Sequence, residues 1–311
     1  MRGTLELAGE RTPARPGPGP VPDAVLRALD LTVRRRIEGL LAGEARSSSL
    51  GVGTELAQVR PYEPGDDVRQ IDWNVTARTG QPHVRVHVAE RALASWLLLD
   101  TSPSMAFGTA DRRKADVAEG VALAVGHLAS RRGNRIGLVS FGDGSPRVVP
   151  PRQGRAGLLC VLLELRRAGE SKARGATSLG DIFSFAARLA RQRALVFCVS
   201  DFRGPRDWRR SLLELSARHD VVAIEIRDPR EQELPDVGEL WLVDPETGRQ
   251  LRVDTGRRAL RERFATAAAA ERDELAGTLR SLGVDHLVLS TAGDWVRSLA
   301  TFLRGRKTVR R

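Results

Sequence analysis

The chain has 311 residues, of which 41% are hydrophobic and 29% charged, enough for a folded protein with a sizeable core. The formal net charge is +11, and all except three of the 50 basic residues are arginine, with acids interleaved among them. Only 5% of residues are aromatic. Because few aromatic side chains are available to stack on bases, no nucleic-acid partner is expected. No stretch is long and apolar enough to cross a bilayer and the N-terminus lacks a signal-peptide core, which predicts a cytoplasmic protein.

The first part of the chain is poor in regular patterns. Residues 1–22 are rich in Pro, Gly and Arg, a composition that disfavours helices and inner strands, so a disordered leader is predicted. Residues 23–43 carry leucines at helical spacing, which predicts a helix that begins after the last of these prolines. Residues 44–93 are loop-rich, except that HVRVHVAE at 83–90 alternates as a strand does. The sequence therefore predicts an N-terminal segment over residues 23–93.

From residue 94 onward, strand patterns alternate with helical ones. Apolar runs predict strands at SWLLLD, RIGLVSF, ALVFCVSD, VVAIEI and DHLVLST, with RVVPP as a short edge strand and a hairpin around PETG. Helices are predicted at residues 112–131, 154–168, 178–192, 207–219, 257–282 and 294–304. Wholly apolar strands between amphipathic helices indicate an α/β fold with a doubly wound, mostly parallel sheet over residues 94–305, followed by a basic tail at 306–311.

Oxygen-bearing side chains follow two of these strands and begin one of the helices. LLLDTSPSM presents Asp100, Ser102 and Ser104, ALVFCVSD ends in Asp201, and RGATSLGD presents Thr177 before a helix. Ligands of doubly wound sheets bind at the carboxyl ends of the strands, where these loops would meet. Carboxylate and hydroxyl oxygens suit Mg²⁺ or Mn²⁺. The alternative is that these residues only cap the helices that follow them.

The three pieces in order, D-x-S-x-S, G-x-T-x-L and a strand-terminal Asp, resemble the metal-ion-dependent adhesion site of von Willebrand factor A domains. The resemblance implies that Ser102 and Ser104 coordinate the ion directly and that Thr177 does so directly or through water. Asp100 and Asp201 would hold coordinating waters, or bind directly in another state. A carboxylate from a partner protein would then complete the shell of a Mg²⁺ or Mn²⁺ ion.

A second resemblance lies upstream, where YEPGDDVRQIDW at residues 62–73 resembles the signature of the bacterial "domain of unknown function 58" family. Together the two resemblances cover roughly residues 25–305. The acids of the signature lie close to arginines, so a structural ion-pair network is one interpretation and a partner-docking loop is the other. The possible docking residues are Asp66, Asp67, Arg69 and Asp72. Trp73 is expected to pack in a core.

These resemblances imply a non-enzymatic binding module that works with a MoxR-type AAA+ ATPase and its client in complex assembly or maturation. A phosphatase-like hydrolase is an alternative, but phosphatases of the haloacid dehalogenase type need a second acid where Ser102 stands. The P-loop, GxSxG and HExxH motifs are all missing from the sequence. A basic nucleic-acid-binding protein is the other alternative, and it predicts a steep salt dependence of binding.

Overall fold

The computed structural model describes residues 13–29, 55–88, 94–129, 135–142, 144–170, 178–204, 206–243 and 249–305. The chain divides into a larger compact unit, Met1–Ile37 with Leu93–Arg311, and a smaller one, Glu38–Ala92. The predicted Thr177 and the basic tail at 306–311 lie outside the described residues. None of the described helices is long and apolar enough to cross a membrane.

The larger unit is built on a six-stranded sheet of order β10-β7-β6-β3-β4-β5. Its strands are β3 (Ala94–Asp100), β4 (Arg135–Phe141), β5 (Arg147–Gln153), β6 (Leu195–Ser200), β7 (Asp220–Arg227) and β10 (Asp285–Ser290). Every neighbouring pair is parallel except β4 and the edge strand β5. Within this sheet, the chain begins at the central strand β3 and continues outward through β4 and β5. It then crosses to β6 on the other side of β3 and continues outward through β7 and β10. The predicted doubly wound, mostly parallel sheet is confirmed.

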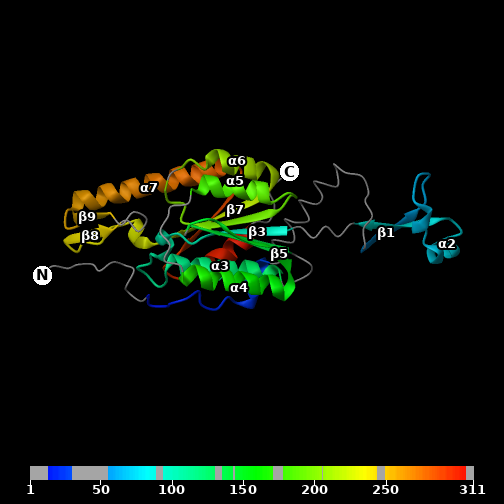
Figure 1. Ribbon diagram of the computed structural model, residues 1–311, viewed down its shortest axis with the longest axis horizontal. Helices are drawn as coiled ribbons and strands as arrows, with labels where there is room; N and C mark the ends of the chain where they lie inside the picture. The colour runs from blue at the N-terminus through cyan, green and yellow to red at the C-terminus, as the bar shows by residue number, and fades with distance from the viewer. Residues whose placement is uncertain are drawn as a thin grey trace. The chain divides into compact units, whose positions relative to one another are not determined.

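Helices cover both faces of this sheet. In Figure 1, α5, α6 and α7 lie above the strands, and α3 and α4 lie below them. The helices are α3 (Lys114–Ala129), α4 (Gly154–Glu170), α5 (Leu179–Leu189), α6 (Arg209–Arg218), α7 (Arg258–Ser281) and α8 (Trp295–Gly305). Because both faces are covered, all six residues of β6 are buried. A strand that is covered on both faces needs no polar face, which explains its nearly continuous apolar sequence.

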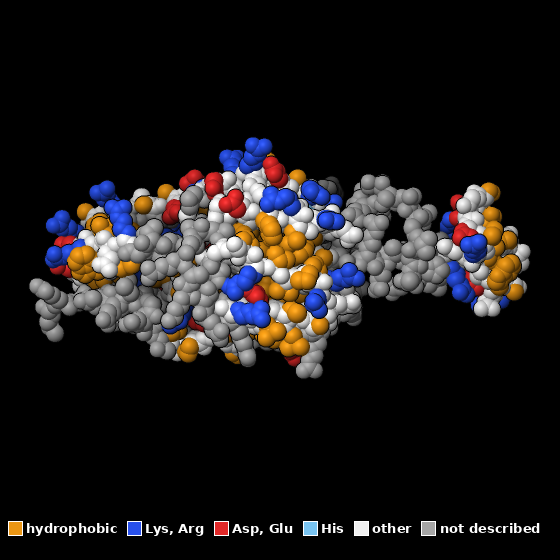
Figure 2. All heavy atoms as spheres, in the orientation of Figure 1, with side chains coloured by type: hydrophobic (Ala, Val, Ile, Leu, Met, Phe, Trp, Pro, Cys, Tyr) orange, Lys and Arg blue, Asp and Glu red, His pale blue; other side chains and the backbone are white. Residues whose placement is uncertain are grey.

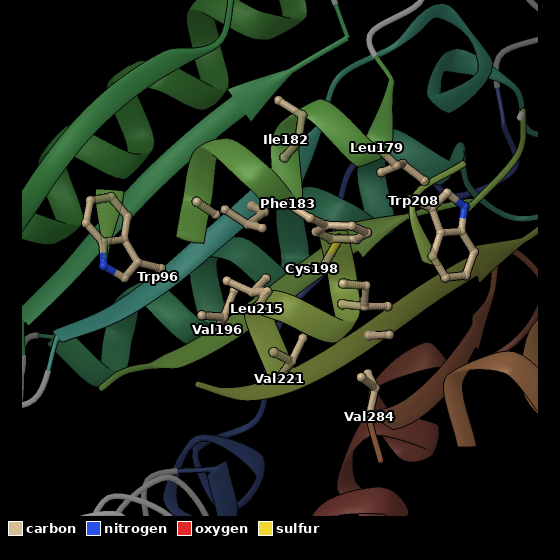
Figure 3. Packing of buried hydrophobic residues seen from close by; sticks show 14 of the residues in the cluster. Trp96, Leu179, Ile182, Phe183, Val196, Cys198, Trp208, Leu215, Val221 and Val284 are labelled. Atoms are coloured by element: carbon tan, nitrogen blue, oxygen red, sulfur yellow. The ribbon is translucent and has the colours of Figure 1, made fainter. Parts of the chain in front are cut away.

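The core between β6 and the helices above it also fixes a loop at the edge of the sheet. Phe183 of α5 and Cys198 of β6 are buried in this layer, which Figure 3 shows from close by. Trp208 packs edge-on against Phe183, with ring centroids 6.3 Å apart, and against Phe202, with centroids 6.1 Å apart. Aromatic pairs of this geometry add to the stabilisation from burial. The loop that follows β6 is therefore held at two points.

The smaller unit pairs two strands around a short helix. β1 (Glu55–Pro61) runs antiparallel to β2 (His83–Val88), and η1 (Val68–Gln70) and α2 (Trp73–Thr79) lie between them. The alternation in the sequence predicts β2, but β1 and α2 were missed. α2 has only seven residues and is specified by its ends, where Asp72 accepts from the backbone N–H groups of the first turn and Gly80 takes a left-handed φ of 70°.

The described part of the proline-rich leader lies in the larger unit rather than apart from it. Residues 13–22 form no helix or strand, as their composition predicts. Their carbonyl groups nevertheless accept side-chain hydrogen bonds: Trp295 Nε1 donates to the carbonyl oxygen of Pro18 at 3.1 Å, and Arg112 donates to that of Arg15 at 3.0 Å. Residues 23–29 form the start of the predicted helix, whose remainder lies outside the described residues.

The C-terminal half carries the predicted hairpin and closes with helices. β8 (Glu239–Val243) and β9 (Gln250–Asp254) pair antiparallel, as the sequence predicts. Ahead of them, η3 (Pro229–Glu231) follows the end of β7. This short helix brings an acidic side chain to the carboxyl edge of the sheet.

The arginine-rich surface is interleaved with acids. On the face drawn in Figure 2, several Lys and Arg side chains stand beside Asp and Glu. Arg206 contacts the carboxylates of Glu271 and Glu274 on α7, and Arg258 contacts Glu262 one turn along the same helix. Much of the positive charge is therefore balanced locally.

A buried histidine gives the larger unit a pH-dependent stability. His219 is 4% exposed, and its Nδ1 accepts from the backbone N–H of Ala194 at 3.2 Å. Burial, and then the charges of Arg218 and Arg193, lower its pKa to about 4. The unfolded chain therefore takes up the proton first, so this stability is fully present above pH 6.5 and is lost as the pH falls toward 4.

We expect urea unfolding to show a loss of roughly 2–3 kcal/mol between pH 7 and pH 4 that His219→Gln does not show. The wild type and the variant are compared at each pH, because titrating carboxylates contribute equally to both. Equal pH dependences in the two proteins would contradict this assignment.

Candidate functional site

Two acidic side chains meet at the carboxyl edge of the sheet. Asp100 is the last residue of β3, and Asp201 follows the last residue of β6. β3 and β6 are parallel neighbours in register, with Leu99 paired to Val199, so their ends lie side by side. Both aspartates are buried. The structure therefore brings together the first and last members of the predicted metal site.

The two serines lie on a tight turn directly after β3. The 3-10 helix η2 (Pro103–Ala106) begins after Ser102. The backbone N–H of Ser102 donates to Asp100 Oδ1 at 2.9 Å, and the hydroxyls of Ser102 and Ser104 lie 3.0 Å apart. Two hydroxyl oxygens at this separation, beside two carboxylates, can face one ion. Four of the five predicted residues are thus gathered, while Thr177 lies outside the described residues.

This turn is held against the neighbouring strand. Thr101 donates to the carbonyl oxygen of Phe141 at the end of β4 through both its backbone N–H, at 2.7 Å, and its hydroxyl, at 2.8 Å. Gly142 comes next, with a φ of 108°, and a Cβ at that position would lie 2.4 Å from the backbone nitrogen of Ser102. Only glycine permits this approach. The position of Ser102 is therefore set by β4 as well as by β3.

Burial makes the negative charge of Asp100 costly. Burial, and then the neighbouring charge of Asp201, raise its pKa to about 6, against the opposing effect of hydrogen bonds from Ser102 and Ser200. The Ser200 hydroxyl donates to Asp100 Oδ2 at 2.5 Å. The buried carboxylate of Asp100, beside the charge of Asp201, creates a negative potential, which a cation would relieve.

A lysine that the sequence analysis missed already supplies one such charge. Lys114, the first residue of α3, is 0% exposed, and its Nζ donates to Asp201 Oδ2 at 2.6 Å and to Glu231 Oε1 at 2.7 Å. Burial opposes the charge of Asp201, but the charge and hydrogen bond of Lys114 prevail, with help from Arg203 N–H and Ser104, and lower the pKa of Asp201. One signal was present in the sequence: Lys114 is one of only three lysines.

The residue after Asp201 has an unusual backbone. Phe202 has a φ of 53°, the only positive value at a non-glycine residue in the described part of the chain. Such a conformation costs free energy and persists where the surroundings enforce it, often beside functional sites. Here the Phe202 ring is buried against Trp208, and its N–H donates to the Ser200 hydroxyl at 3.0 Å. The core therefore fixes the direction in which Asp201 leaves β6.

Asp228 ties the surrounding loops together. It is 0% exposed and follows β7. Its carboxylate accepts from the Thr109 N–H at 2.8 Å, the Thr291 hydroxyl at 2.6 Å and the Arg230 N–H at 2.9 Å. The Asp228 N–H in turn donates to Glu231 at 3.1 Å, which completes a capping box on η3. One carboxylate thus joins the loops after β3, β7 and β10.

A cleft opens beside this edge. It lies between the loop after β6, the end of β7 and α7. Asp201 and Glu231 line one side of it, and Arg203 pairs with Glu231 at 3.5 Å. The lining of the cleft thus joins the acidic edge of the sheet to further arginine and glutamate side chains.

In the smaller unit, the predicted docking acids are engaged internally. Asp66 pairs with Arg60 at 2.7 Å, Asp72 pairs with Arg85 at 2.9 Å, and the Asp67 carboxylate accepts from the Arg69 N–H at 3.0 Å. Asp72 also caps α2 by accepting from the N–H groups of Asn74 and Val75. These contacts match the structural ion-pair interpretation of the signature.

Trp73 does not lie in a core. The interpretation that it packs inside is wrong, because 71% of its surface is exposed, as is 61% of that of Val68. The reason is local: Asp72 caps α2 and points inward, and the next residue of this first turn faces outward. The side chains that the smaller unit presents to solvent are thus apolar as well as charged.

The donors at the sheet edge fit a hard divalent ion. Among the described residues, no group of three or more His, Cys, Asp and Glu side chains is arranged to bind a metal. An ion at this edge would therefore depend on the Ser102 and Ser104 hydroxyls together with Asp100 and Asp201. Oxygen donors with few direct charges suit Mg²⁺, which keeps several waters.

Comparison with known proteins places the chain among relatives without an assigned role. The family model described as "Protein of unknown function DUF58" matches residues 58–274. An uncharacterized protein of Mycobacterium tuberculosis is 41% identical over 286 residues, covering 91% of this chain and 89% of the relative. The matched region includes both the smaller unit's signature and the residues from Asp100 to Asp201.

Solved structures resemble the chain more distantly. An aerotolerance-related membrane protein from Bacteroides fragilis is 13% identical, with a TM-score of 0.41, over 68% of this chain and 97% of that one. The SpRpn10 VWA domain is 16% identical, with a TM-score of 0.37, over 68% of this chain and 94% of that one.

The hydrogen bonds of Asp228 should make it one of the most sensitive positions at this edge. We expect Asp228→Ala to lower the free energy of unfolding by about 3 kcal/mol or more, because donors from three loops lose a buried acceptor. Thr291→Val removes one of these donors and should cost about 1 kcal/mol. Urea unfolding measures both. A loss below about 1 kcal/mol for Asp228→Ala would contradict its role in joining the loops.

Proposed function

The chain belongs to the DUF58 family of proteins of unknown function, and we propose that it is a non-enzymatic module that binds an acidic residue of a partner protein through a bridging Mg²⁺ or Mn²⁺ ion. One observation carries the proposal: Asp100, Ser102, Ser104 and Asp201, which are separated by up to a hundred residues in sequence, meet at one edge of the sheet. That edge is where doubly wound folds bind their ligands.

Each residue has a distinct part in the proposal. The hydroxyls of Ser102 and Ser104 would be the direct ligands, and Thr177 would add a third oxygen directly or through water. Asp100 and Asp201 would hold the ion's waters by hydrogen bonds. The ion would supply positive charge at the carboxyl edge of the sheet, where these acidic side chains lie. Because the direct ligands are neutral, that charge stays available to a partner's carboxylate.

The residues favour binding over hydrolysis. A phosphatase of the haloacid dehalogenase type needs a general acid two residues after its nucleophile, and this chain has Ser102 there. The Ser102 hydroxyl lies 3.0 Å from that of Ser104. Among the described residues, no hydrogen bond joins it to a histidine that would act as a base. A carboxylate-binding ion needs neither group. The proposal therefore assigns no reaction to this edge.

We further propose that the partner is a MoxR-type AAA+ ATPase with its client, in complex assembly or maturation. This part rests on the family signature, which lies in the smaller unit. In that unit, Asp66, Asp67, Arg69 and Asp72 belong to the same signature as the exposed Trp73. Exposed tryptophans flanked by polar groups are frequent centres of protein interfaces. A partner would then contact the chain through this signature as well as through the ion.

Affinity capture with a MoxR-type ATPase from the same genome tests the proposal, with Mg²⁺ or with EDTA. We expect Asp100→Ala and EDTA each to abolish capture, and Asp100→Ala to abolish Mn²⁺ binding in calorimetry, while the circular dichroism spectrum stays that of the wild type. Asp273→Ala, which removes an exposed acid of α7, is the matched control and should change neither.

The same experiment has a clear opposite outcome. Capture that survives both EDTA and Asp100→Ala would show that binding does not pass through a metal at this edge. A steep salt dependence of RNA or DNA binding, with no capture of the ATPase, would support the nucleic-acid alternative instead.

A further inference from the structure

The candidate metal site contains a cation of its own. Lys114 Nζ lies within hydrogen-bond distance of carboxylates on two different loops, Asp201 after β6 and Glu231 at the end of η3. The lysine is fully buried, and its ammonium also lies 5.7 Å from the centre of the Phe107 ring. A buried ammonium persists only where such partners compensate for its lost hydration.

The choice of lysine fits the space. In a chain whose basic residues are almost all arginine, the position between these two carboxylates holds a lysine. An ammonium is a compact point charge with three donors, whereas a guanidinium is a wide planar fork. The two short contacts, at 2.6 and 2.7 Å, use the compact group in a way that arginine could not without moving the carboxylates.

Counting charges shows what this ammonium does to the site. Asp201 and Glu231 are balanced by Lys114 and by Arg203, which lies 3.5 Å from Glu231. Of the three carboxylates Asp100, Asp201 and Glu231, only Asp100 has no basic partner among the described residues. Its oxygens accept hydrogen bonds from the Ser102 N–H and the Ser200 hydroxyl. The site therefore carries about one net negative charge rather than two or three.

We propose that Lys114 is a resident cation that tunes this site: it keeps Asp201 and Glu231 in place without a metal and weakens the binding of a divalent ion by its like charge. The inference rests on the proposed function, because it assumes that an ion binds beside Asp100. A weakly neutralised ion keeps more positive charge for a partner's carboxylate. The ammonium thereby favours capture of the partner over permanent retention of the ion.

The arrangement also links the site to a neighbouring loop. Glu231 accepts from Lys114 through Oε1 and from the Asp228 N–H through Oε2. Asp228 in turn accepts from the Thr109 N–H and the Thr291 hydroxyl. A displacement of Lys114 would therefore shift η3 and, through Asp228, the loops after β3 and β10. These loops lie at the edge of the sheet that a partner would contact.

The test compares Mn²⁺ affinity, measured by electron paramagnetic resonance of the free ion, in the full chain and its variants. We expect Lys114→Met, which removes the charge and keeps an unbranched side chain, to bind Mn²⁺ about tenfold more tightly than the wild type. Mn²⁺ should also raise the melting temperature of Lys114→Met by more than that of the wild type. Arg218→Met removes a positive charge at the opposite edge of the sheet and should change the affinity less than about twofold.

A second variant covers the case in which Lys114→Met does not fold. Glu231→Gln keeps an oxygen that can accept from the Asp228 N–H. It removes the carboxylate charge that competes with Asp201 for the ammonium of Lys114, so Lys114 neutralises Asp201 more fully. We expect Mn²⁺ to bind this variant severalfold more weakly than the wild type. Unchanged or tighter binding in Glu231→Gln would overturn the proposal.

The outcomes separate this inference from the proposed function. If the wild type binds Mn²⁺, Asp100→Ala does not, and a folded Lys114→Met binds equally or more weakly than the wild type, the resident-cation role is wrong and the metal site stands. If the wild type binds no Mn²⁺ and Lys114→Met does, the lysine is confirmed as the site's cation and the metal-dependent function fails. If Asp100→Ala binds Mn²⁺ as the wild type does, both fail.

Discussion

Two like charges buried side by side are the constraint around which this edge of the sheet is arranged. Asp100 and Asp201 end on neighbouring parallel strands, where burial disfavours both carboxylates. Hydrogen bonds from Ser200 and Ser102 stabilise the carboxylate of Asp100. The ammonium of Lys114 stabilises that of Asp201. Replacing buried charged pairs by well-packed apolar residues is often neutral or stabilising, so stability alone does not account for these charges.

The fold itself was largely predictable, because its signals are long and repeated. Strands such as β6, buried over their whole length and almost entirely apolar, alternate with amphipathic helices, and that pattern specifies a covered parallel sheet. Asp100, Ser102 and Asp201 were found because each lies at the end of such a strand or within two residues of it. The smaller unit was predicted poorly. Its helix α2 is fixed by the Asp72 cap and the left-handed Gly80, which are single-residue signals without periodicity.

The parts of the site that the sequence did not reveal are joined over long distances. Lys114 and Glu231 are 117 positions apart in the sequence, and Asp228 and its partner Thr109 are 119 positions apart. Each looks in sequence like an ordinary helix or turn residue, and only the crossing of the chain between strands brings them together. Trp73 was misjudged for the opposite reason: a large apolar side chain is usually buried, and only the local cap turns it outward.

The most direct test of the account is a crystal structure of the protein grown with Mn²⁺, with data collected at the manganese absorption edge. We expect an anomalous peak about 2.0–2.3 Å from the hydroxyl oxygens of both Ser102 and Ser104, with Asp100 and Asp201 bonded to its waters and Lys114 still between Asp201 and Glu231. Data without a peak at this edge, with the two serine hydroxyls still bonded to each other at saturating Mn²⁺, would contradict it.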